Sequence, residues 1–525
     1  MRGGVKATQD VGFRFSASYQ KETDARICYW RRGAGPVRHH VGERAATAWF
    51  VARSAVAGMI ALWLLVATAT GDTGGMPAAL QHALNAAGHP RMRWGDISDV
   101  RNLLSRSYVM RSWRPLWSMN GRLTQPGRQV LAELDSARAR GLDPADYDAA
   151  ALDARADSLP ALDVAAAAEF DVMLSAATAR HAHALSRGRV DPHLLHPMLD
   201  APTDSVDVAA VLDQLTRTQR PDTVFRNLEP RHASYLRLVD LLAQYRRLAG
   251  PGVSRSADSV PVRIRQIELA LERWRWLPHS ASAPWIVVNV PAFRLYALAS
   301  DREEPGDMLR MNVVAGQAAQ HPTPLLVTSI VAVQFHPPWI VPRPIAIREI
   351  RPLALRDSAF LGRQHYELLH GDTVVAATRA NVLRIGAVID VRQAPGPWNA
   401  LGDIKFVTPN AADVYLHDTP TRQDFVRPER DLSHGCIRVA EPVLLAEFVL
   451  QGEPEWTRDR IDDALTDSTT RVVPLQRPIP VFVVYQTLVP RESGGILVYP
   501  DVYGYDKRLE AFLRAGYAHP MAPIP

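Results

Sequence analysis

Apolar residues between positions 80 and 247 recur every three or four positions, which is the spacing of the buried face of an α-helix. The clearest stripe contains five residues: Phe170, Leu174, Ala177, His181 and Leu185. Gly188 follows this stripe and fits a helix C-cap, because glycine readily adopts the left-handed conformation found there. Similar helices are predicted at about 125–140 and 234–248. We therefore expect an all-α domain over residues 80–247.

The periodicity changes at residue 248. Residues 248–261 are rich in Gly, Pro and Ser, a composition typical of a linker. The next segment, 262–278, is predicted as a connecting helix with one apolar stripe, formed by Ile264, Ile267, Leu271 and Trp274. This helix is expected to stop at Pro278, because proline disrupts the interior of a helix.

From residue 284 onward, runs rich in β-branched and aromatic residues are separated by Gly, Pro or Asp, as expected for short strands. The predicted strands are 285–290, 294–298, 311–315, 325–331, 404–407 and 414–416. A β-rich domain is therefore predicted at 284–490, followed by a C-terminal extension at 491–525. The fold class expected for the whole chain is α+β, with several domains.

The N-terminal region has the layout of an export signal. Residues 54–71 contain no charged side chain, and their apolar core is followed by Ala67-Thr68-Ala69, a small-x-small site for signal cleavage. We expect cleavage there, so that the mature protein begins at Thr70. A single-span inner-membrane anchor is the alternative, since the segment is close to the lower limit of about 17 residues for a transmembrane helix.

Charge separates the first 53 residues from the rest of the chain. This basic leader, 1–53, carries a net charge of +6, and the whole chain carries +5, so the remainder is near neutral at −1. A nucleic-acid-binding domain would present a basic surface, so we expect no nucleic-acid partner. The leader is far longer than the flank of an ordinary signal peptide, and a translation start at Val51 would explain its length.

The exported part of the chain contains a single cysteine, Cys436, because Cys28 precedes the export signal. Exported proteins usually pair their cysteines or lack them, so a lone thiol is a candidate nucleophile. Cys436 follows His434 and Gly435 directly, and His417 lies upstream at the end of an apolar run. An imidazole that takes the thiol proton would activate the sulfur for attack on a carbonyl.

The stretch 391–442 closely resembles the catalytic core of YkuD-type L,D-transpeptidases. The signature of that family is a histidine, a spacer of about fifteen residues, and Ser/Thr-His-Gly-Cys; here it is His417 followed by the run 433–436. Other blocks resemble the large, YcbB-like periplasmic subgroup: 311–316, 336–342 and 499–504, with 141–147 and 188–192 in the helical half.

The resemblance implies a helical scaffold domain at 80–247 and an L,D-transpeptidase catalytic domain at 284–490, with a capping subdomain inserted at about 344–390. Members of the subgroup commonly carry a small peptidoglycan-binding module in front of the connecting helix. Here only the short segment 248–261 joins the scaffold to that helix. We therefore expect this chain to lack the module.

The resemblance also implies a cysteine acyltransferase whose partners are peptidoglycan stem peptides. Cys436 would attack a donor tetrapeptide with His417 as the base, release D-alanine and form a thioester. The backbone N–H groups of Gly435 and Cys436 would form the oxyanion hole. An acceptor amine would then resolve the thioester and leave a diaminopimelate–diaminopimelate cross-link. Sensitivity to carbapenems, a part in cell wall biogenesis and cell shape, and a periplasmic location follow from the same resemblance.

Four further residues are candidates for supporting the site or binding substrate: Ser433, His434, Arg438 and Tyr415. We expect Ser433 to be structural, since a hydroxyl is a weaker nucleophile than an activated thiol. His434 is expected to orient its neighbours rather than act as the base. Arg438 suits either a substrate carboxylate or a supporting salt bridge, and Tyr415 suits a wall of the site.

Three other functions stay open from the sequence. His417, His434 and Cys436 could ligate a zinc ion in a peptidase, although no HExxH-type pair accompanies them, and we expect neither a metal nor a cofactor. Water could resolve the same thioester, which would make the protein an L,D-carboxypeptidase. The helical half could also belong to a non-catalytic peptidoglycan-binding scaffold, although an intact cysteine and histidine argue against it.

Overall fold

The computed structural model of the chain describes residues 75–199, 206–249, 259–280, 284–299, 308–491 and 493–516. All of them belong to one compact unit, Gly74–Pro525. The predicted leader, the apolar segment 54–71 and most of the predicted linker lie outside these residues. None of the helices described has the length and apolar character needed to span a membrane.

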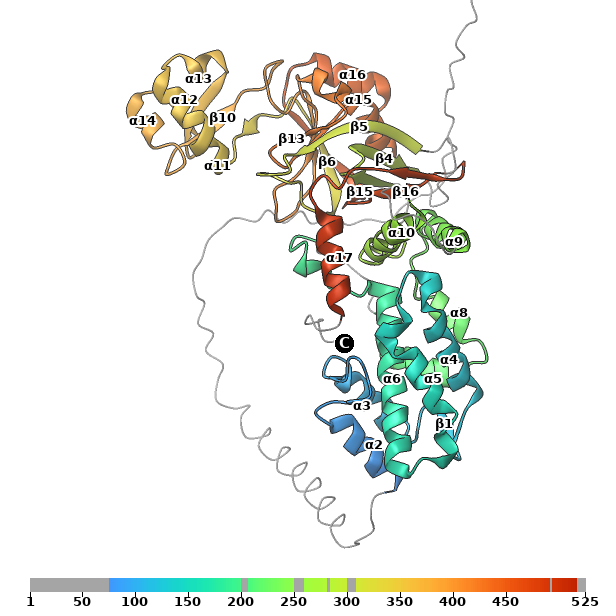
Figure 1. Cartoon of the computed structure of the whole chain (residues 1–525). Helices are drawn as coiled ribbons and strands as arrows, with labels where there is room; N and C mark the ends of the chain where they lie inside the picture. Colours follow the sequence, from blue (N-terminus) through green and yellow to red (C-terminus); the bar gives the residue numbers. More distant parts are fainter. Residues whose placement is uncertain are drawn as a thin grey trace, which may run out of the picture. The chain divides into compact units, whose positions relative to one another are not determined.

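The N-terminal half is helical, as predicted, and most of its helices pack around the long helix α6 (Figure 1). The α-helices are α2 (Met76–Asn85), α3 (Arg101–Met110), α4 (Gln125–Asp135), α5 (Ala149–Ala156), α6 (Val164–Arg187), α7 (Val208–Arg217), α8 (Pro221–Arg226) and α9 (Ala233–Leu248). Short 3₁₀ turns are η1 (Ser136–Arg140), η2 (Pro144–Tyr147), η3 (Leu159–Ala161) and η4 (Pro192–Leu194), and a small hairpin joins β1 (Ser118–Met119) to β2 (Arg122–Leu123).

Helix α6 shows why the sequence stripe predicted this half correctly. The Asp163 side chain caps its first turn by accepting a hydrogen bond from the Ala166 N–H, and Gly188 ends the helix with a positive φ of 81°. Most residues of α6 are buried on all sides, so the helix forms the centre of the scaffold core. The predicted helices at 125–140 and 234–248 correspond to α4 with η1 and to α9.

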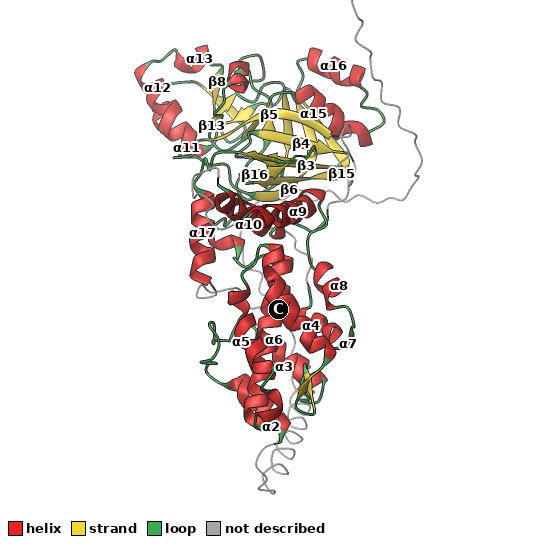
Figure 2. Cartoon of the chain, turned by 45° about the vertical axis from the view of Figure 1, so that its right-hand side comes forward, coloured by secondary structure: helices red, strands yellow, loops and turns green. Residues whose placement is uncertain are grey.

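The C-terminal half is built on a large sheet, drawn in yellow in Figure 2. This sheet has nine strands in the order β13-β5-β14-β12-β11-β6-β15-β3-β4. Strands β4 and β5 also pair, so the sheet closes on itself. Its strands are β3 (Trp285–Asn289), β4 (Arg294–Leu298), β5 (Met308–Gly316), β6 (Leu326–Phe335), β11 (Ile404–Val407), β12 (Leu416–His417), β13 (Asp431–Ser433), β14 (Ile437–Val439) and β15 (Arg471–Val484).

One face of this sheet lines an apolar interior and the other face is covered by helices. Ile286, Val313 and Phe406 belong to the interior core, which also includes residues of α15 (Pro442–Val449) and α16 (Arg458–Thr466). Helices α9 and α10 (Val260–Arg275) pack with Trp285 and Val287 on the opposite face. Residues i and i+2 of a strand share a face, so the strand register determines which side chains of neighbouring strands lie close together on each face of the sheet.

A separate small core lies between Val341 and Val391. It contains the four-stranded sheet β7-β10-β8-β9, with β7 (Trp339–Ile340), β8 (Tyr366–His370), β9 (Thr373–Val375) and β10 (Asp390–Gln393). Its helices are α11 (Arg343–Ile345), the π-helical turn η5 (Ala346–Ile350), α12 (Arg351–Arg356), α13 (Phe360–Arg363) and α14 (Arg379–Leu383). This substructure occupies the position at which a capping insertion was predicted, and we call it the cap.

The remaining elements follow or support the large sheet. They are η6 (Arg422–Val426), η7 (Leu450–Gly452), the hairpin of β16 (Leu488–Pro490) and β17 (Ile496–Val498), and α17 (Tyr505–Ala515). Helix α17 contacts α10, and the Asp506 carboxylate forms an ion pair of 2.6 Å with Arg273 of α10. The predicted C-terminal extension is therefore folded against the connecting helix over its described residues.

Candidate active site

Cys436 lies in a tight turn between β13 and β14. The buried Ser433 hydroxyl donates to the Cys436 carbonyl oxygen at 2.5 Å and accepts from the Gly435 N–H at 3.1 Å. Gly435 has a φ of 112°, a conformation that L side chains rarely adopt, so glycine is required at this point of the turn. Ser433 therefore holds the shape of the turn, in agreement with the structural role expected from the sequence.

A second set of contacts fixes the turn from outside. The fully buried Thr323 donates its hydroxyl to the Gly435 carbonyl oxygen at 2.8 Å and accepts from the Gly316 N–H at 2.8 Å. The Tyr503 hydroxyl donates to the Gly316 carbonyl oxygen at 2.6 Å. A Cβ atom on Gly316 would clash with the His321 carbonyl, so the close approach of these segments requires glycine.

The register of three strands places four of the predicted site residues on one face of the sheet. His417 of β12 lies opposite Arg438 of β14 and Lys405 of β11. Tyr415 and Cys436 come two residues before His417 and Arg438, so they point to the same side. The intervening residues of these strands belong to the apolar interior. The sheet thus separates a polar face, which carries the chemistry, from the core.

His417 is buried and neutral. Its Nδ1 lies 2.5 Å from the backbone oxygen of Asp418. A carbonyl oxygen only accepts, so Nδ1 carries the proton and Nε2 keeps the lone pair of a base. Burial first, and then the positive charges of Arg438 and Lys405, lower the pKa of His417 to about 3.

The thiol of Cys436 is uncharged in this environment. Burial raises its pKa above the ordinary value, while hydrogen bonds from the backbone and hydroxyl of Tyr415 and the charge of Lys405 act in the opposite direction. The Lys405 ammonium lies 3.9 Å from the centre of the Tyr415 ring, a cation–π contact. Cys436 contacts the Asp413 carbonyl oxygen at 3.8 Å, and among the described residues no hydrogen bond joins it to His417.

Arg438 forms a supporting salt bridge. Its Nη1 lies 3.2 Å from a carboxylate oxygen of Asp424 in η6, and both side chains are largely shielded from solvent. Of the two roles expected for Arg438, this contact corresponds to the salt bridge. Its charge also acts on His417, as described above, so it helps to keep that imidazole neutral.

The His434 side chain points toward the cap. Its Nε2 lies 2.7 Å from a carboxylate oxygen of Glu349 in η5, and its ring lies 4.8 Å from that of His321. The described residues contain no group of three or more His, Cys, Asp or Glu side chains arranged to hold a metal ion. The contact with Glu349 joins the turn that carries Cys436 directly to the cap.

One of the two expected oxyanion donors is already engaged. The Gly435 N–H donates to the Ser433 hydroxyl, whereas the Cys436 N–H has no hydrogen-bond acceptor among the described residues. In this conformation, only the Cys436 N–H is available to a developing oxyanion. The two-donor oxyanion hole therefore stays a prediction, and its Gly435 part requires the Ser433 hydroxyl to turn away.

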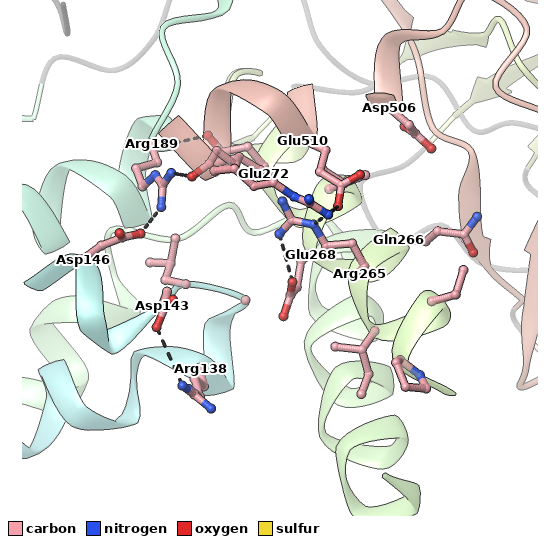
Figure 3. Close-up of a pocket in the computed structure, with 18 of the residues that line it drawn as sticks. Arg138, Asp143, Asp146, Arg189, Arg265, Gln266, Glu268, Glu272, Asp506 and Glu510 are labelled. Carbon is pink, nitrogen blue, oxygen red and sulfur yellow. Dashed lines mark hydrogen bonds and ion pairs between the residues drawn. The ribbon is translucent and has the colours of Figure 1, made fainter. Parts of the chain in front are cut away.

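A large charged cavity lies apart from Cys436. It has a volume of about 1200 Å³ and is lined by the scaffold, α10 and α17 (Figure 3). Its arginines have acidic partners: Arg138 lies 3.8 Å from Asp143, and Arg265 lies 3.1 Å from Glu268 and 3.4 Å from Glu510. Each arginine that lines the cavity thus has an acidic partner, and much of the charge there is neutralised within the protein.

Four residues of the site were not identified from the sequence: Lys405, Thr323, Tyr503 and Glu349. Side chains alternate along the predicted strand 404–407, so Lys405 lies on the face opposite to Phe406. This alternation could have indicated that Lys405 belongs to the polar face, where the structure pairs it with His417. The other three come from distant segments, and their contacts depend on the tertiary fold.

The segment that carries Cys436 and His417 matches a known family. Residues 283–458 match the family model of the L,D-transpeptidase catalytic domain, and residues 102–242 match that of a scaffold domain. The chain is also 31% identical over 256 residues to a Haemophilus influenzae protein named "Putative L,D-transpeptidase". That alignment covers 47% of this chain and 49% of the relative, so it spans about half of either protein. Together the two family matches cover more than half of the chain, which therefore combines a YkuD-type L,D-transpeptidase catalytic domain with a scaffold domain, the YcbB-like architecture.

Proposed function

We propose that the protein is a peptidoglycan L,D-transpeptidase with Cys436 as its nucleophile and His417 as its base. The observation that carries the proposal is the common face of β12 and β14, which holds a lone thiol beside a buried, neutral imidazole. The Nδ1 of that imidazole is committed to the Asp418 carbonyl, so Nε2 is the atom that accepts the thiol proton.

In the first half of the reaction, the Cys436 sulfur attacks the carbonyl that precedes the terminal D-alanine of a donor tetrapeptide, and its proton passes to His417 Nε2. The oxyanion that forms is stabilised by the Cys436 N–H. The amide bond to D-alanine then breaks. The leaving amine takes the proton from His417, and a thioester remains on Cys436.

In the second half, an amine of an acceptor stem attacks the thioester and transfers its proton to His417, and the Cys436 thiolate leaves and takes this proton back from His417. The product is a diaminopimelate–diaminopimelate cross-link. The same thioester resolved by water would give a tripeptide, which is the carboxypeptidase outcome. Tyr415 and Lys405 support the sulfur in both halves, because the hydroxyl donates to it and the ammonium is attracted to its negative charge.

Incubation of the protein with purified disaccharide-tetrapeptide, followed by mass spectrometry, tests the proposal. Cross-linked dimers with loss of D-alanine are expected. Tripeptides without dimers would assign the carboxypeptidase reaction instead, and unchanged substrate would leave only a binding role. Activity that disappears on chelation and returns with zinc would contradict the cysteine mechanism.

The proposed location is the periplasm, where peptidoglycan is the substrate. The signal segment 54–71 lies outside the described residues, so this location rests on the sequence pattern and on the family. N-terminal sequencing of protein purified from its native envelope is expected to give Thr70. A start upstream of residue 54, in protein that stays in the membrane after a high-salt wash, would instead identify an anchor.

A further inference from the structure

Two segments of the cap are strongly basic. Residues 343–356 form α11, η5 and α12, and residues 379–388 form α14 and the turn that follows it. Together the two segments contain six arginines and a single acidic residue, Glu349. The arginines are Arg343, Arg348, Arg351, Arg356, Arg379 and Arg384, and all of them except Arg351 are exposed.

The ion pairs of the cap leave these six arginines out. Within the described residues, the ion pairs that involve the cap are Arg363–Asp357, Arg392–Glu367 and His434–Glu349. The single acid of the two segments, Glu349, is therefore already engaged. Asp390, which begins β10, is the first acidic residue after the second segment. Positive charge thus predominates on both segments.

The two segments pack side by side, as the neighbouring helices α12 and α14 show in Figure 1. Arg379 of α14 donates to the Leu355 carbonyl oxygen of α12 at 3.5 Å. A Cβ atom on Gly386 would lie 3.6 Å from the Cγ atom of Arg343. The arginines of the two segments therefore lie close together. We call the surface formed by residues 343–356 and 379–388 the arginine face.

The arginine face lies beside the turn that carries Cys436. Arg348 directly precedes Glu349, whose carboxylate lies 2.7 Å from His434, and His434 comes two residues before Cys436. The helical segment 343–356 is about 20 Å long, at a rise of 1.5 Å per residue. When one unit of a polymer occupies the catalytic site, the units next to it can therefore reach the arginine face.

The arginine face is poor in apolar side chains. Its exposed large apolar residues are Leu353, Leu383 and Val388, and neither segment contains Trp or Tyr. A helix that lies on a membrane surface presents a broad apolar side, usually with Trp, Phe or Leu. The face therefore favours an anionic polymer in water over a lipid surface.

The charge of the face is complementary to carboxylates. A guanidinium group binds a carboxylate through two parallel hydrogen bonds. Peptidoglycan stem peptides carry free carboxylates, and a glycan strand repeats these stems along its length. A single exposed ion pair is weak. Several pairs to one polymer are stronger together, because after the first contact the others form at a high effective concentration.

We propose that the arginine face binds the free carboxylates of polymeric peptidoglycan outside the catalytic site. It holds the strand while one of its stems reacts at Cys436, and the stems bound at the face do not react there. This inference rests on the proposed function, which makes peptidoglycan the substrate.

Co-sedimentation with purified sacculi measures this binding. Each protein is the full chain with Cys436→Ala, so that the polymer is bound without being processed. Native sacculi are compared with sacculi whose carboxylates have been converted to methylamides. Native sacculi are expected to bind at least tenfold more tightly than amidated sacculi, and 500 mM salt should remove most of this difference, because exposed charges are screened.

A double variant removes charge from the face. Arg343→Gln combined with Arg384→Gln is expected to weaken binding to native sacculi at least fivefold and binding to amidated sacculi less than twofold. The control is Arg460→Gln combined with Arg477→Gln, two exposed arginines on α16 and β15 that form no ion pair in the described part of the chain. This control should change either affinity less than twofold. The amidation comparison needs no variant of the face, so it tests the proposal even if the double variant does not fold.

Kinetics with Cys436 intact separates docking from the reaction. The double variant of the face should raise KM for release of D-alanine from sacculi at least fivefold, with kcat unchanged. The soluble disaccharide-tetrapeptide has no neighbouring stems, so its reaction should change less than twofold.

Three results would overturn the proposal. They are equal binding to native and amidated sacculi, equal losses in the double variant and its control, and binding to phosphatidylglycerol vesicles that the double variant loses while sacculi binding stays unchanged. The last result would assign the arginine face to lipid headgroups. A wild-type protein that binds sacculi but leaves the soluble tetrapeptide unchanged would instead contradict the proposed function, because that substrate does not need the arginine face.

Discussion

Lowering the pH from 7 to 5 tests whether His417 acts as a base in the environment that the fold gives it. Burial and the charges of Arg438 and Lys405 lower its pKa to about 3. At pH 5 an imidazole with the ordinary pKa of about 6.5 is only about 3% neutral, whereas one with a pKa of about 3 is about 99% neutral. The rate of a general-base reaction through His417 should therefore change less than twofold between pH 7 and pH 5, whereas with a solvated histidine it would fall about 25-fold.

The assay is the rate of carbapenem acylation of Cys436, followed by mass spectrometry between pH 4.5 and 8. His417→Gln provides the comparison, because without a base only the spontaneously formed thiolate reacts. Burial raises the pKa of the Cys436 thiol, so in this variant the rate should be orders of magnitude lower near neutral pH and rise about tenfold per pH unit. His434→Gln should have a smaller effect than His417→Gln.

Two results would refute this reasoning. A wild-type rate that falls with a midpoint near pH 6.5 would mean that the imidazole titrates as it does in water, despite its burial. A wild-type rate that rises tenfold per pH unit, in parallel with His417→Gln, would mean that the thiolate forms without help from His417. Equal losses in the His417 and His434 variants would transfer the role of base to His434.

Four further predictions concern the nucleophile, its turn, the cap and stability in acid. Cys436→Ala should abolish cross-linking and carbapenem acylation without a change in circular dichroism, and a mass increase on this variant would identify another nucleophile. Ser433→Ala leaves the Gly435 N–H without its acceptor and should lower the free energy of unfolding by about 1–3 kcal/mol in urea titrations. Glu349→Gln weakens a partly exposed contact with His434 worth about 0.2–1 kcal/mol, so KM should change less than about fivefold while the acylation rate of bound substrate stays the same. Burial lowers the pKa of His181 to about 3 in the folded state, so the stability that is present above pH 6.5 is lost as the pH falls toward 3. At pH 5 this loss amounts to about 2 kcal/mol of unfolding free energy, and urea titrations should show that His181→Leu does not suffer it.

The elements predicted well are those whose pattern depends on local burial. Strands β4 and β11 begin and end where the sequence indicated, and α9 differs by one residue. The longest strand, β15, was not identified, because Pro474, Pro478 and Pro480 interrupt it. Proline normally argues against a central strand. The pairing of β15 with β6 shifts register between Pro474 and Ile479, and this irregularity, which no single-sequence pattern contains, accommodates the prolines.

The predictions for the candidate site divide in the same way, into those that depend on local sequence and those that depend on the tertiary fold. Cys436 and His417 were predicted as site residues from their spacing and residue types, and Tyr415 because it shares a strand face with His417; these assignments stay predictions. The lowered pKa of His417 could not be predicted, since it depends first on burial in the fold and then on the charges of Arg438 and Lys405 from two other strands. The sequence also could not indicate that the Ser433 hydroxyl accepts a hydrogen bond from the Gly435 N–H, because that contact depends on the backbone conformation of the turn.

The contacts around Cys436 differ in strength according to their burial. The exposed contact with the cap can therefore break for substrate entry while the buried turn of Cys436 keeps its backbone geometry. The turn that carries Cys436 is held by buried hydrogen bonds from Ser433 and Thr323, and breaking either one leaves unmet polar groups at about 1–3 kcal/mol each. The cap reaches the same turn through the exposed pair of Glu349 and His434, worth about 0.2–1 kcal/mol. Thermal energy is about 0.6 kcal/mol, so this cap contact opens often while the turn stays formed. A substrate can therefore displace the cap contact and still meet a thiol whose backbone has not moved.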